Sequence, residues 1–224
     1  MKNERDMPEP SQEHRKERIR RHYEHRIGGD LPHHAVLDWA SAESQLARFQ
    51  IFARNVPLQD KSLLDVGCGL GDLLTYLDGL GLRVRYTGLD LLEKMVQAAK
   101  RNHPAHDFVQ GDIFQANPFE PESFDVVFCS GAFNLNLGNN EQFLPRAVAA
   151  LLELAREHAV FNLLHSRAAS QERTYFYCHP DQVREMLRGC PCQVRIVDDY
   201  LHNDFTVICE KQQHPPQRSP RTQR

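Results

Sequence analysis

A glycine-rich segment and an aspartate that follows it carry the clearest chemistry in the sequence. The segment Asp65-Val-Gly-Cys-Gly-Leu-Gly71 places glycines at positions 67, 69 and 71. Glycines in this spacing let a backbone turn sharply and approach a ligand closely, and a helix that begins directly after them offers free N–H groups. Asp90 follows about 20 residues later, where an acidic side chain can accept both hydroxyls of a ribose. The pattern predicts a nucleoside-like ligand.

A second acidic position extends this prediction to the base of the nucleoside. In Gly111-Asp112-Ile113, the Asp112 carboxylate can accept a hydrogen bond from an exocyclic amine. Ile113 and Leu91 can clamp an adenine ring between them. The position that a dinucleotide fingerprint assigns to its last glycine is here Asp72, and a carboxylate is unfavourable beside a pyrophosphate at a helix N-terminus. We therefore expect a ligand without phosphate, and a dinucleotide oxidoreductase is the weaker alternative.

Strand and helix signals alternate along the middle of the chain and place these residues. Strands are predicted over residues 62–67, 84–90, 107–112, 124–130 and 158–164, with helices over 72–80, 93–102, 144–155 and 180–188. Two further strands, 193–199 and 204–210, are separated only by Tyr200 to Asn203, so they must be antiparallel. The order predicts an α/β protein with a Rossmann-like, doubly wound sheet. The acidic residues then lie at the carboxyl ends of successive strands.

In combination, the loop, the acids and the terminal hairpin resemble the class I S-adenosylmethionine-dependent methyltransferases over roughly residues 63–210. The resemblance implies a seven-stranded sheet in the order 3-2-1-4-5-7-6, mostly parallel with an antiparallel last strand. It implies that S-adenosylmethionine is the cofactor and that its methionine part lies on the loop of Asp65, Gly67, Gly69 and Gly71. Asp90 would bind the ribose, and Asp112, Ile113 and Leu91 the adenine. Ser130 and Gly131 would contact the cofactor and face the acceptor.

The segment that follows the fourth strand narrows the choice of acceptor. Ser130-Gly-Ala-Phe-Asn134 lacks the Asn/Asp-Pro-Pro-aromatic motif of enzymes that methylate amino groups of adenine or glutamine. Cys129-Ser130 and Asn162 to His165 stand where metal-dependent catechol-type enzymes carry carboxylates, so no metal is expected. A small-molecule acceptor, methylated by in-line displacement, is the prediction. His165 is the candidate general base. That it only satisfies nearby backbone groups stays an alternative.

The residues before the first predicted strand are expected to form a lid. A helix over Ala40 to Arg54 carries Arg48, which could pair with the carboxylate of the cofactor. A solvated face is the alternative for this arginine. Tyr23 could cover the cofactor. The predicted organisation is a charged tail or helix over 1–26, a cofactor-binding methyltransferase domain over 27–210 with its helical lid over 27–58, and a flexible basic tail over 211–224.

Composition limits the remaining classes. The chain of 224 residues is 41% hydrophobic and 25% charged, with a net charge of −3. This balance excludes collagen-like and grossly disordered chains. No apolar run approaches the roughly 20 residues that a membrane span needs. Six cysteines without an apolar leader predict a reduced, cytoplasmic protein.

The charge is unevenly distributed along the chain. Residues 211–224 carry four basic and no acidic side chains, and residues 1–26 carry eight basic and six acidic ones, so the body between them is acidic. An acidic body disfavours nucleic acid as a partner. An RNA or protein methyltransferase guided by the basic ends, and a non-catalytic regulatory domain that binds S-adenosylmethionine, remain alternatives.

Overall fold

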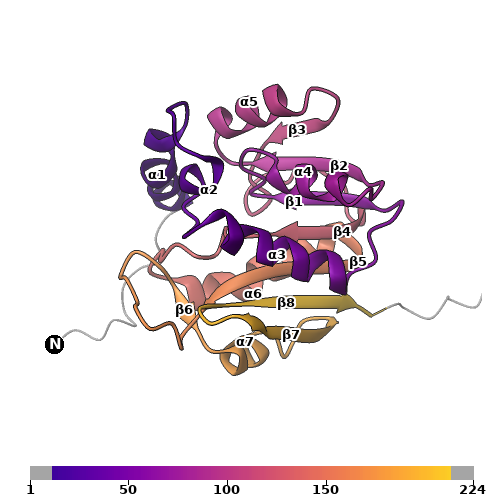
Figure 1. Ribbon diagram of the computed structural model, residues 1–224. Coiled ribbons are helices and arrows are strands. Elements are labelled where there is room, and N and C mark those ends of the chain that lie inside the picture. The colour runs from indigo at the N-terminus through magenta and orange to yellow at the C-terminus, as the bar shows by residue number, and fades with distance from the viewer. Residues whose placement is uncertain (1–11, 213–224) are drawn as a thin grey trace, which may run out of the picture.

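The computed structural model describes residues 12–212 (Figure 1). Its helical elements are α1 (Gln12–Tyr23), the 3-10 helix η2 (Glu24–Arg26), α2 (His33–Val36), α3 (Ala42–Asn55), α4 (Asp72–Gly79), α5 (Glu93–Asn102), α6 (Asn140–Leu154) and α7 (Pro180–Met186). Its strands are β1 (Ser62–Val66), β2 (Arg85–Asp90), β3 (Asp107–Gln110), β4 (Phe124–Cys129), β5 (Ala155–His165), β6 (Tyr177–Cys178), β7 (Cys192–Leu201) and β8 (Asp204–Lys211). The tails predicted for residues 1–11 and 213–224 lie outside the described residues.

The strands form one mixed sheet in the order β3-β2-β1-β4-β5-β8-β7. Neighbours from β3 to β5 are parallel, whereas β8 runs antiparallel to both β5 and β7. The predicted order is therefore confirmed. The sheet has eight strands rather than seven, because the two-residue strand β6 pairs with the end of β5 beside this path. A two-residue strand has no periodicity of its own, so the sequence of Tyr177 and Cys178 gives no strand signal.

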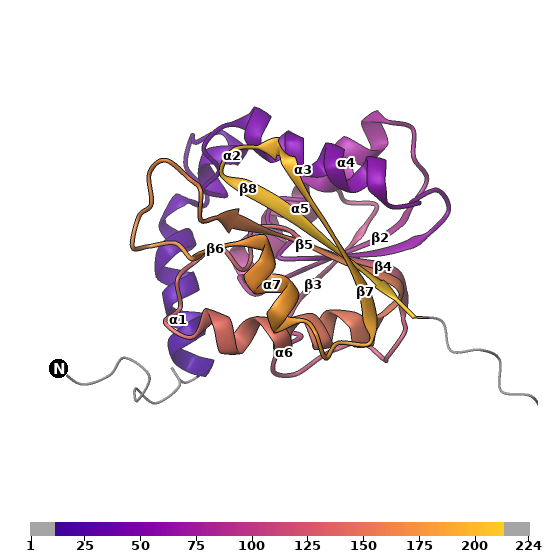
Figure 2. The same ribbon diagram turned by 90° about the horizontal axis from the view of Figure 1, so that it is seen from below.

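Helices cover both faces of the sheet (Figure 2). Successive side chains of a strand point to opposite faces, so Leu63 of β1 packs with residues of α3, α4 and α5, and Leu64 with residues of α6 and α7. Both leucines are fully buried. Strands with two covered faces are largely apolar, as β1 and β4 are apart from one aspartate in each.

The N-terminal segment packs beside the carboxyl ends of the strands rather than standing apart from the body. Ile19 and Tyr23 of α1 and Leu37 after α2 belong to one apolar cluster with Leu70 of the glycine loop and Leu92, the residue before α5. Helix α3 begins after Ser41, whose side chain and that of Ser44 cap each other's backbone N–H groups. The residues from α1 to the start of α3 thereby lie at the edge of the sheet where the predicted site lies, whereas α3 itself runs along one face of the sheet (Figure 1).

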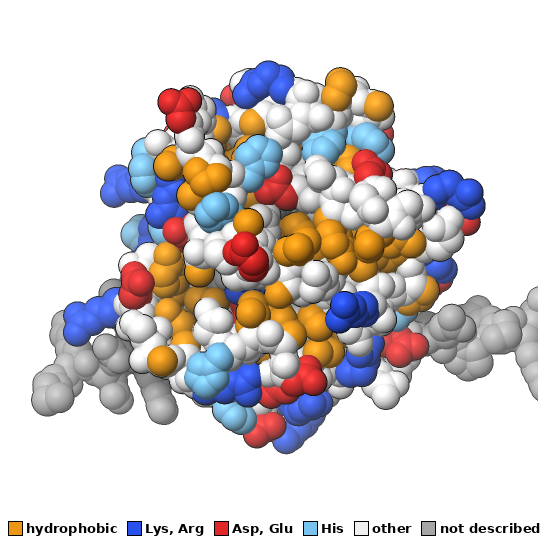
Figure 3. All heavy atoms as spheres, viewed as in Figure 1, with side chains coloured by type: hydrophobic (Ala, Val, Ile, Leu, Met, Phe, Trp, Pro, Cys, Tyr) orange, Lys and Arg blue, Asp and Glu red, His pale blue; other side chains and the backbone are white. Residues whose placement is uncertain are grey.

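The face that carries α3 and α4 also shows a band of hydrophobic side chains across its middle (Figure 3). The groove between these helices is lined in part by Leu46, Phe49 and Tyr76, and Leu46 is 39% exposed. This groove shares no lining residue with the cavity described below. Over residues 12–212, no helix combines the length and the apolar content that crossing a membrane requires.

Candidate functional site

One cavity lies at the carboxyl ends of β1, β2 and β4, beneath the N-terminal segment. Seven of the ten residues predicted to bind the cofactor line it, namely Gly67, Gly69, Asp90, Leu91, Asp112, Ile113 and Ser130. Parallel strands bring their carboxyl ends to one edge of a sheet, so residues scattered over the sequence meet here. Asp65, Gly71 and Arg48 do not line the cavity, nor does His165. Tyr23, which was expected to cover the cofactor, does line it.

The glycine loop forms the floor of the cavity. The N–H groups of Gly67 and Cys68 both donate to the carbonyl oxygen of Leu89, at 2.8 and 3.0 Å, which folds the loop back over β2. Gly69 has φ +55°, and a Cβ placed there would lie 2.5 Å from a methyl carbon of Leu37. Gly71 precedes α4 and packs against His103, away from the cavity. The loop thus needs glycine both for backbone conformation and for close contact with the covering segment.

Asp90 is the polar centre of the floor. Its carboxylate accepts hydrogen bonds from the N–H groups of Gly69, at 3.0 Å, and Leu92, at 2.8 Å. Burial raises the pKa of Asp90 to about 6. Each carboxylate oxygen can accept more than one hydrogen bond, so both keep capacity toward the cavity that Asp90 lines. The Asp90 carboxylate can thus accept hydrogen bonds from a ligand that carries hydroxyl groups.

Asp112 is engaged by a residue that sequence reasoning missed. Arg15 of α1 forms an ion pair with the Asp112 carboxylate, which also accepts a hydrogen bond from the N–H of Phe114 at 3.0 Å. The Arg15 guanidinium lies 5.4 Å from the ring centroid of Phe114 and 5.3 Å from that of Phe143. A planar cation thus stands where the resemblance expects adenine. Arg15 is one of several basic residues in α1, and nothing in its spacing singles it out.

The loop after β4 forms a wall of the cavity. Ser130 lines the cavity, and its hydroxyl is buried without a hydrogen-bond partner among the described residues. Gly131 follows with φ +79°, and the ring of Trp39 lies directly against it, 2.8 Å from the position a Cβ would take. Leu37, Trp39, Ala132 and Leu135 complete an apolar wall. An unpaired buried hydroxyl is unfavourable, so Ser130 is a ready partner for a polar ligand atom.

Asp65 and Asp72 support the loop from outside the cavity. Asp65 is buried and accepts a hydrogen bond from the hydroxyl of Tyr86 at 2.7 Å, and its burial raises the pKa of Asp65 to about 7. Asp72 at the start of α4 is bound by His33 at 2.5 Å and by Gln45 at 2.9 Å. Asp72 therefore anchors the covering segment to the loop.

The structure does not bring Arg48 and His165 into the cavity. Arg48 is buried and forms an ion pair with Asp204, so its charge is not available to a cofactor carboxylate. The Nδ1 atom of His165 accepts a hydrogen bond from the N–H of Arg167 at 3.0 Å, and its ring packs edge-on against Phe205. Burial lowers the pKa of His165. The alternative for His165, a histidine that satisfies backbone groups, agrees with this geometry.

Metal ligation has no visible basis in the part of the chain that the structure describes. Over residues 12–212, no three His, Cys, Asp or Glu side chains are grouped so that they could hold a metal ion. The prediction that the reaction uses no metal stays a prediction.

A family model and several known proteins similar to this chain are described as methyltransferases. Residues 63–158 match a family model described as a methyltransferase domain. A Mycobacterium tuberculosis protein, described only as a methyltransferase, is 29% identical over 67% of this chain and 93% of its own length. The phthiotriol/phenolphthiotriol dimycocerosates methyltransferase of the same species is 40% identical, over 39% of this chain and only 34% of that enzyme.

Among solved structures, the magnesium protoporphyrin IX methyltransferase of Synechocystis with bound S-adenosylmethionine has the same fold. It superposes with a TM-score of 0.55 at 18% identity, covering 88% of this chain and 90% of that one.

Proposed function

This chain belongs to the class I S-adenosylmethionine-dependent methyltransferases, and we propose that it methylates a small-molecule acceptor in the cavity beneath α1 and the segment that follows it. When bound, S-adenosylmethionine supplies a methyl group on a positively charged sulfur, open to in-line displacement by a nucleophile. The observation that carries the proposal is the convergence of Asp90, Asp112 and the unpaired Ser130 hydroxyl on one cavity.

The chemistry of the cavity residues fits this cofactor. The Asp90 carboxylate would accept the ribose hydroxyls, and Leu91 and Ile113 would contact the adenine ring. Asp112 would accept from the exocyclic amine, in exchange for its present partner Arg15. Ser130 would gain the hydrogen bond that it lacks. These roles require that the Arg15 side chain of α1 moves away from Asp112 when the cofactor binds.

The residues that remain around the cavity favour an apolar acceptor that needs no side chain as a base. Of the residues lining the cavity, those with titratable side chains are Arg15, Tyr23, Asp90 and Asp112. Burial raises the pKa of Tyr23, so its phenol stays protonated, and the two aspartates are assigned to the cofactor. The acceptor would therefore bring a group that is already nucleophilic near neutral pH. Leu37, Trp39, Ala132 and Leu135 would hold it by apolar contact, and catalysis would rest on positioning.

Calorimetric titration of the full chain with S-adenosylmethionine and S-adenosylhomocysteine tests the proposal. Both ligands should bind, and Asp90→Ala should abolish binding while Asp78→Ala, an exposed residue of α4, should leave it unchanged. Absence of binding by the unaltered chain would overturn the proposal. A labelled-methyl transfer screen over metabolite fractions, with Asp90→Ala as the inactive control, would then identify the acceptor class.

A further inference from the structure

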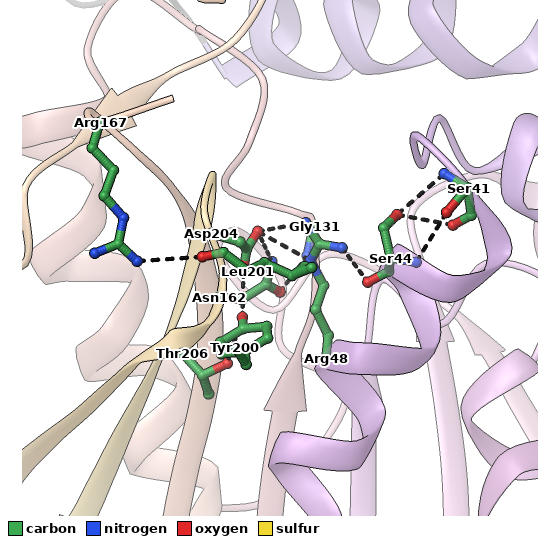
Figure 4. Close-up of polar contacts among 10 residues, drawn as sticks. All are labelled: Ser41, Ser44, Arg48, Gly131, Asn162, Arg167, Tyr200, Leu201, Asp204 and Thr206. Carbon is green, nitrogen blue, oxygen red and sulfur yellow. Dashed lines mark hydrogen bonds and ion pairs between the residues drawn. The ribbon is translucent and has the colours of Figure 1, made fainter. Parts of the chain in front are cut away.

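A buried ion pair between Arg48 and Asp204 joins α3 to β8 (Figure 4). The Nε and Nη2 atoms of Arg48 donate to Oδ2 of Asp204 at 3.0 and 2.6 Å, and Nη1 donates to the carbonyl oxygen of Ser44 at 2.5 Å. The side chain of Arg48 is 3% exposed and that of Asp204 is 0% exposed. Two opposite charges are thus held in the interior with the planar guanidinium fixed in orientation.

Asp204 extends this pair to the loop after β4. Its carboxylate accepts hydrogen bonds from the hydroxyl of Tyr200 and from Nδ2 of Asn162, the latter at 3.3 Å. The Oδ1 atom of the same Asn162 accepts from the N–H of Gly131 at 3.0 Å (Figure 4). The orientation of the Asn162 amide is therefore set by Asp204 on one side and Gly131 on the other. A continuous polar chain links the ion pair to a residue that lines the cavity.

Arg48 reaches the cavity wall by a second route. Its guanidinium carbon lies 4.3 Å from the ring centroid of Trp39, a cation–π contact. Trp39 also lines the cavity, and its ring lies so close to Gly131 that a Cβ on Gly131 would be 2.8 Å from Cη2 of Trp39. Trp39 is thus in contact with both the Arg48 cation and the backbone of the loop after β4. Both routes from the ion pair end at the same place in the wall.

Stability alone gives little reason to place an ion pair here. Removing two charges from water is unfavourable, and well-packed apolar residues often replace a buried pair without loss of stability. A fully hydrogen-bonded network does fix one arrangement of its members, because each alternative leaves a buried polar group unpaired. In this network the members that face ligand space are Trp39 and Gly131.

We propose that Arg48 and Asp204 are positioning residues, which fix Trp39 and Gly131 as the rigid acceptor-side wall of the cavity. This inference rests on the proposed function, because it takes the loop after β4 to face the acceptor. Arg48 then acts through Trp39 and does not itself touch cofactor or acceptor.

Trp39 is the only tryptophan of the chain, so its fluorescence reports on this wall alone. Arg48→Lys keeps the charge opposite Asp204 but loses the planar, forked guanidinium. We expect it to raise the acrylamide quenching constant of Trp39 about twofold or more, and to weaken S-adenosylhomocysteine binding on the order of tenfold or less. Far-UV circular dichroism should not change. The double variant Arg48→Met/Asp204→Asn leaves no unpaired buried charge and should loosen Trp39 in the same way.

Arg195→Met is the matched control. Arg195 of β7 also ties α3 to the sheet, through Nη1 to Oδ1 of Asn55 at 2.5 Å and Nη2 to its carbonyl oxygen at 3.0 Å, but it does so at the last residue of the helix. The Arg195→Met variant should leave the acrylamide quenching constant of Trp39 unchanged. Quenching in both Arg48 variants equal to that of the unaltered chain would overturn the inference, as would an equal rise in Arg195→Met. Failure of the unaltered chain to bind S-adenosylhomocysteine would instead overturn the proposed function, since the quenching comparison needs no ligand.

Discussion

The Oδ2 atom of Asp90 accepts a hydrogen bond from the N–H of Gly69 at 3.0 Å, which ties the end of β2 to the middle of the glycine loop. The other oxygen accepts from the N–H of Leu92 at 2.8 Å. These two bonds hold the carboxylate at the floor of the cavity, and they favour its ionised form against the effect of burial. The protonation state of one side chain is therefore coupled to the shape of the loop.

Ligand binding should strengthen as the pH rises through about 6, the pKa of Asp90. Ribose hydroxyls donate to the ionised carboxylate, so below this pH binding must first release a proton from Asp90. The affinity for S-adenosylhomocysteine should fall about tenfold for each pH unit below 5, measured by calorimetry. In Asp90→Asn this dependence should disappear and binding should be weak at every pH. A pH-independent affinity in the unaltered chain would contradict the assignment.

Replacing Ser130 by alanine should separate stability from binding. The Ser130 hydroxyl is buried and unpaired among the described residues, so its removal should leave the melting temperature unchanged or slightly higher. Loss of one ligand hydrogen bond should weaken S-adenosylhomocysteine binding about 2- to 13-fold. Ser62→Ala should instead lower the melting temperature and leave binding unchanged. The Ser62 hydroxyl donates to the Asp125 carboxylate at 2.8 Å, at the end of β1 that lies away from the cavity. Equal binding by Ser130→Ala and the unaltered chain would remove Ser130 from the site.

Arg15→Ala should tighten binding at the adenine end of the cavity. Arg15 occupies the Asp112 carboxylate, so a ligand amine must displace it. Releasing a hydrogen bond between charged groups, worth about 1.5 kcal/mol, should increase the affinity for adenosine about tenfold, with a smaller gain for inosine, which lacks the exocyclic amine. Arg18→Ala, on the exposed side of the same helix, should have no effect. Weaker binding by Arg15→Ala would mean that the arginine assists the ligand instead of competing with it.

Asp65 should make the chain less stable as the pH rises. Its pKa is about 7 in the folded protein against 3.8 ordinarily, because the carboxyl group is buried. Between these values the folded state keeps a proton that the unfolded state releases, so this contribution is complete below pH 4 and is lost through pH 7. The full loss is on the order of 4 kcal/mol.

Asp65→Asn should therefore flatten the pH dependence of the free energy of unfolding, measured in denaturant at pH 5 and pH 8. The amide oxygen can still accept the hydrogen bond from Tyr86, so the variant should be more stable than the unaltered chain at pH 8. Asp78→Asn, at an exposed position, is the control. An unchanged slope in Asp65→Asn would show that Asp65 is ionised in the folded protein throughout this range.

Most of the sheet and the floor of the site could be predicted because both depend on local pattern. Apolar runs flanked by glycine and polar residues marked the strands, and the short gap from Tyr200 to Asn203 required an antiparallel hairpin. Asp90 and Asp112 needed no knowledge of distant contacts, since residues at the carboxyl ends of neighbouring parallel strands must lie together. The strand order was confirmed with one addition, the two-residue β6.

The sequence by itself determined that the glycine loop and the ends of β2 and β3 would meet at one edge of the sheet, because periodicity and chain connectivity leave few alternative folds. Only the tertiary structure decided which distant side chains pair. Arg48 forms an ion pair with Asp204, 156 positions away, and is not available to a ligand. Arg15 forms an ion pair with Asp112, 97 positions away. The guanidinium of an arginine on an amphipathic helix can contact solvent, a ligand or a buried acid. Which of these it contacts depends on which buried acidic side chain of the packed sheet has no other partner. That information exists only once α1 and α3 are docked.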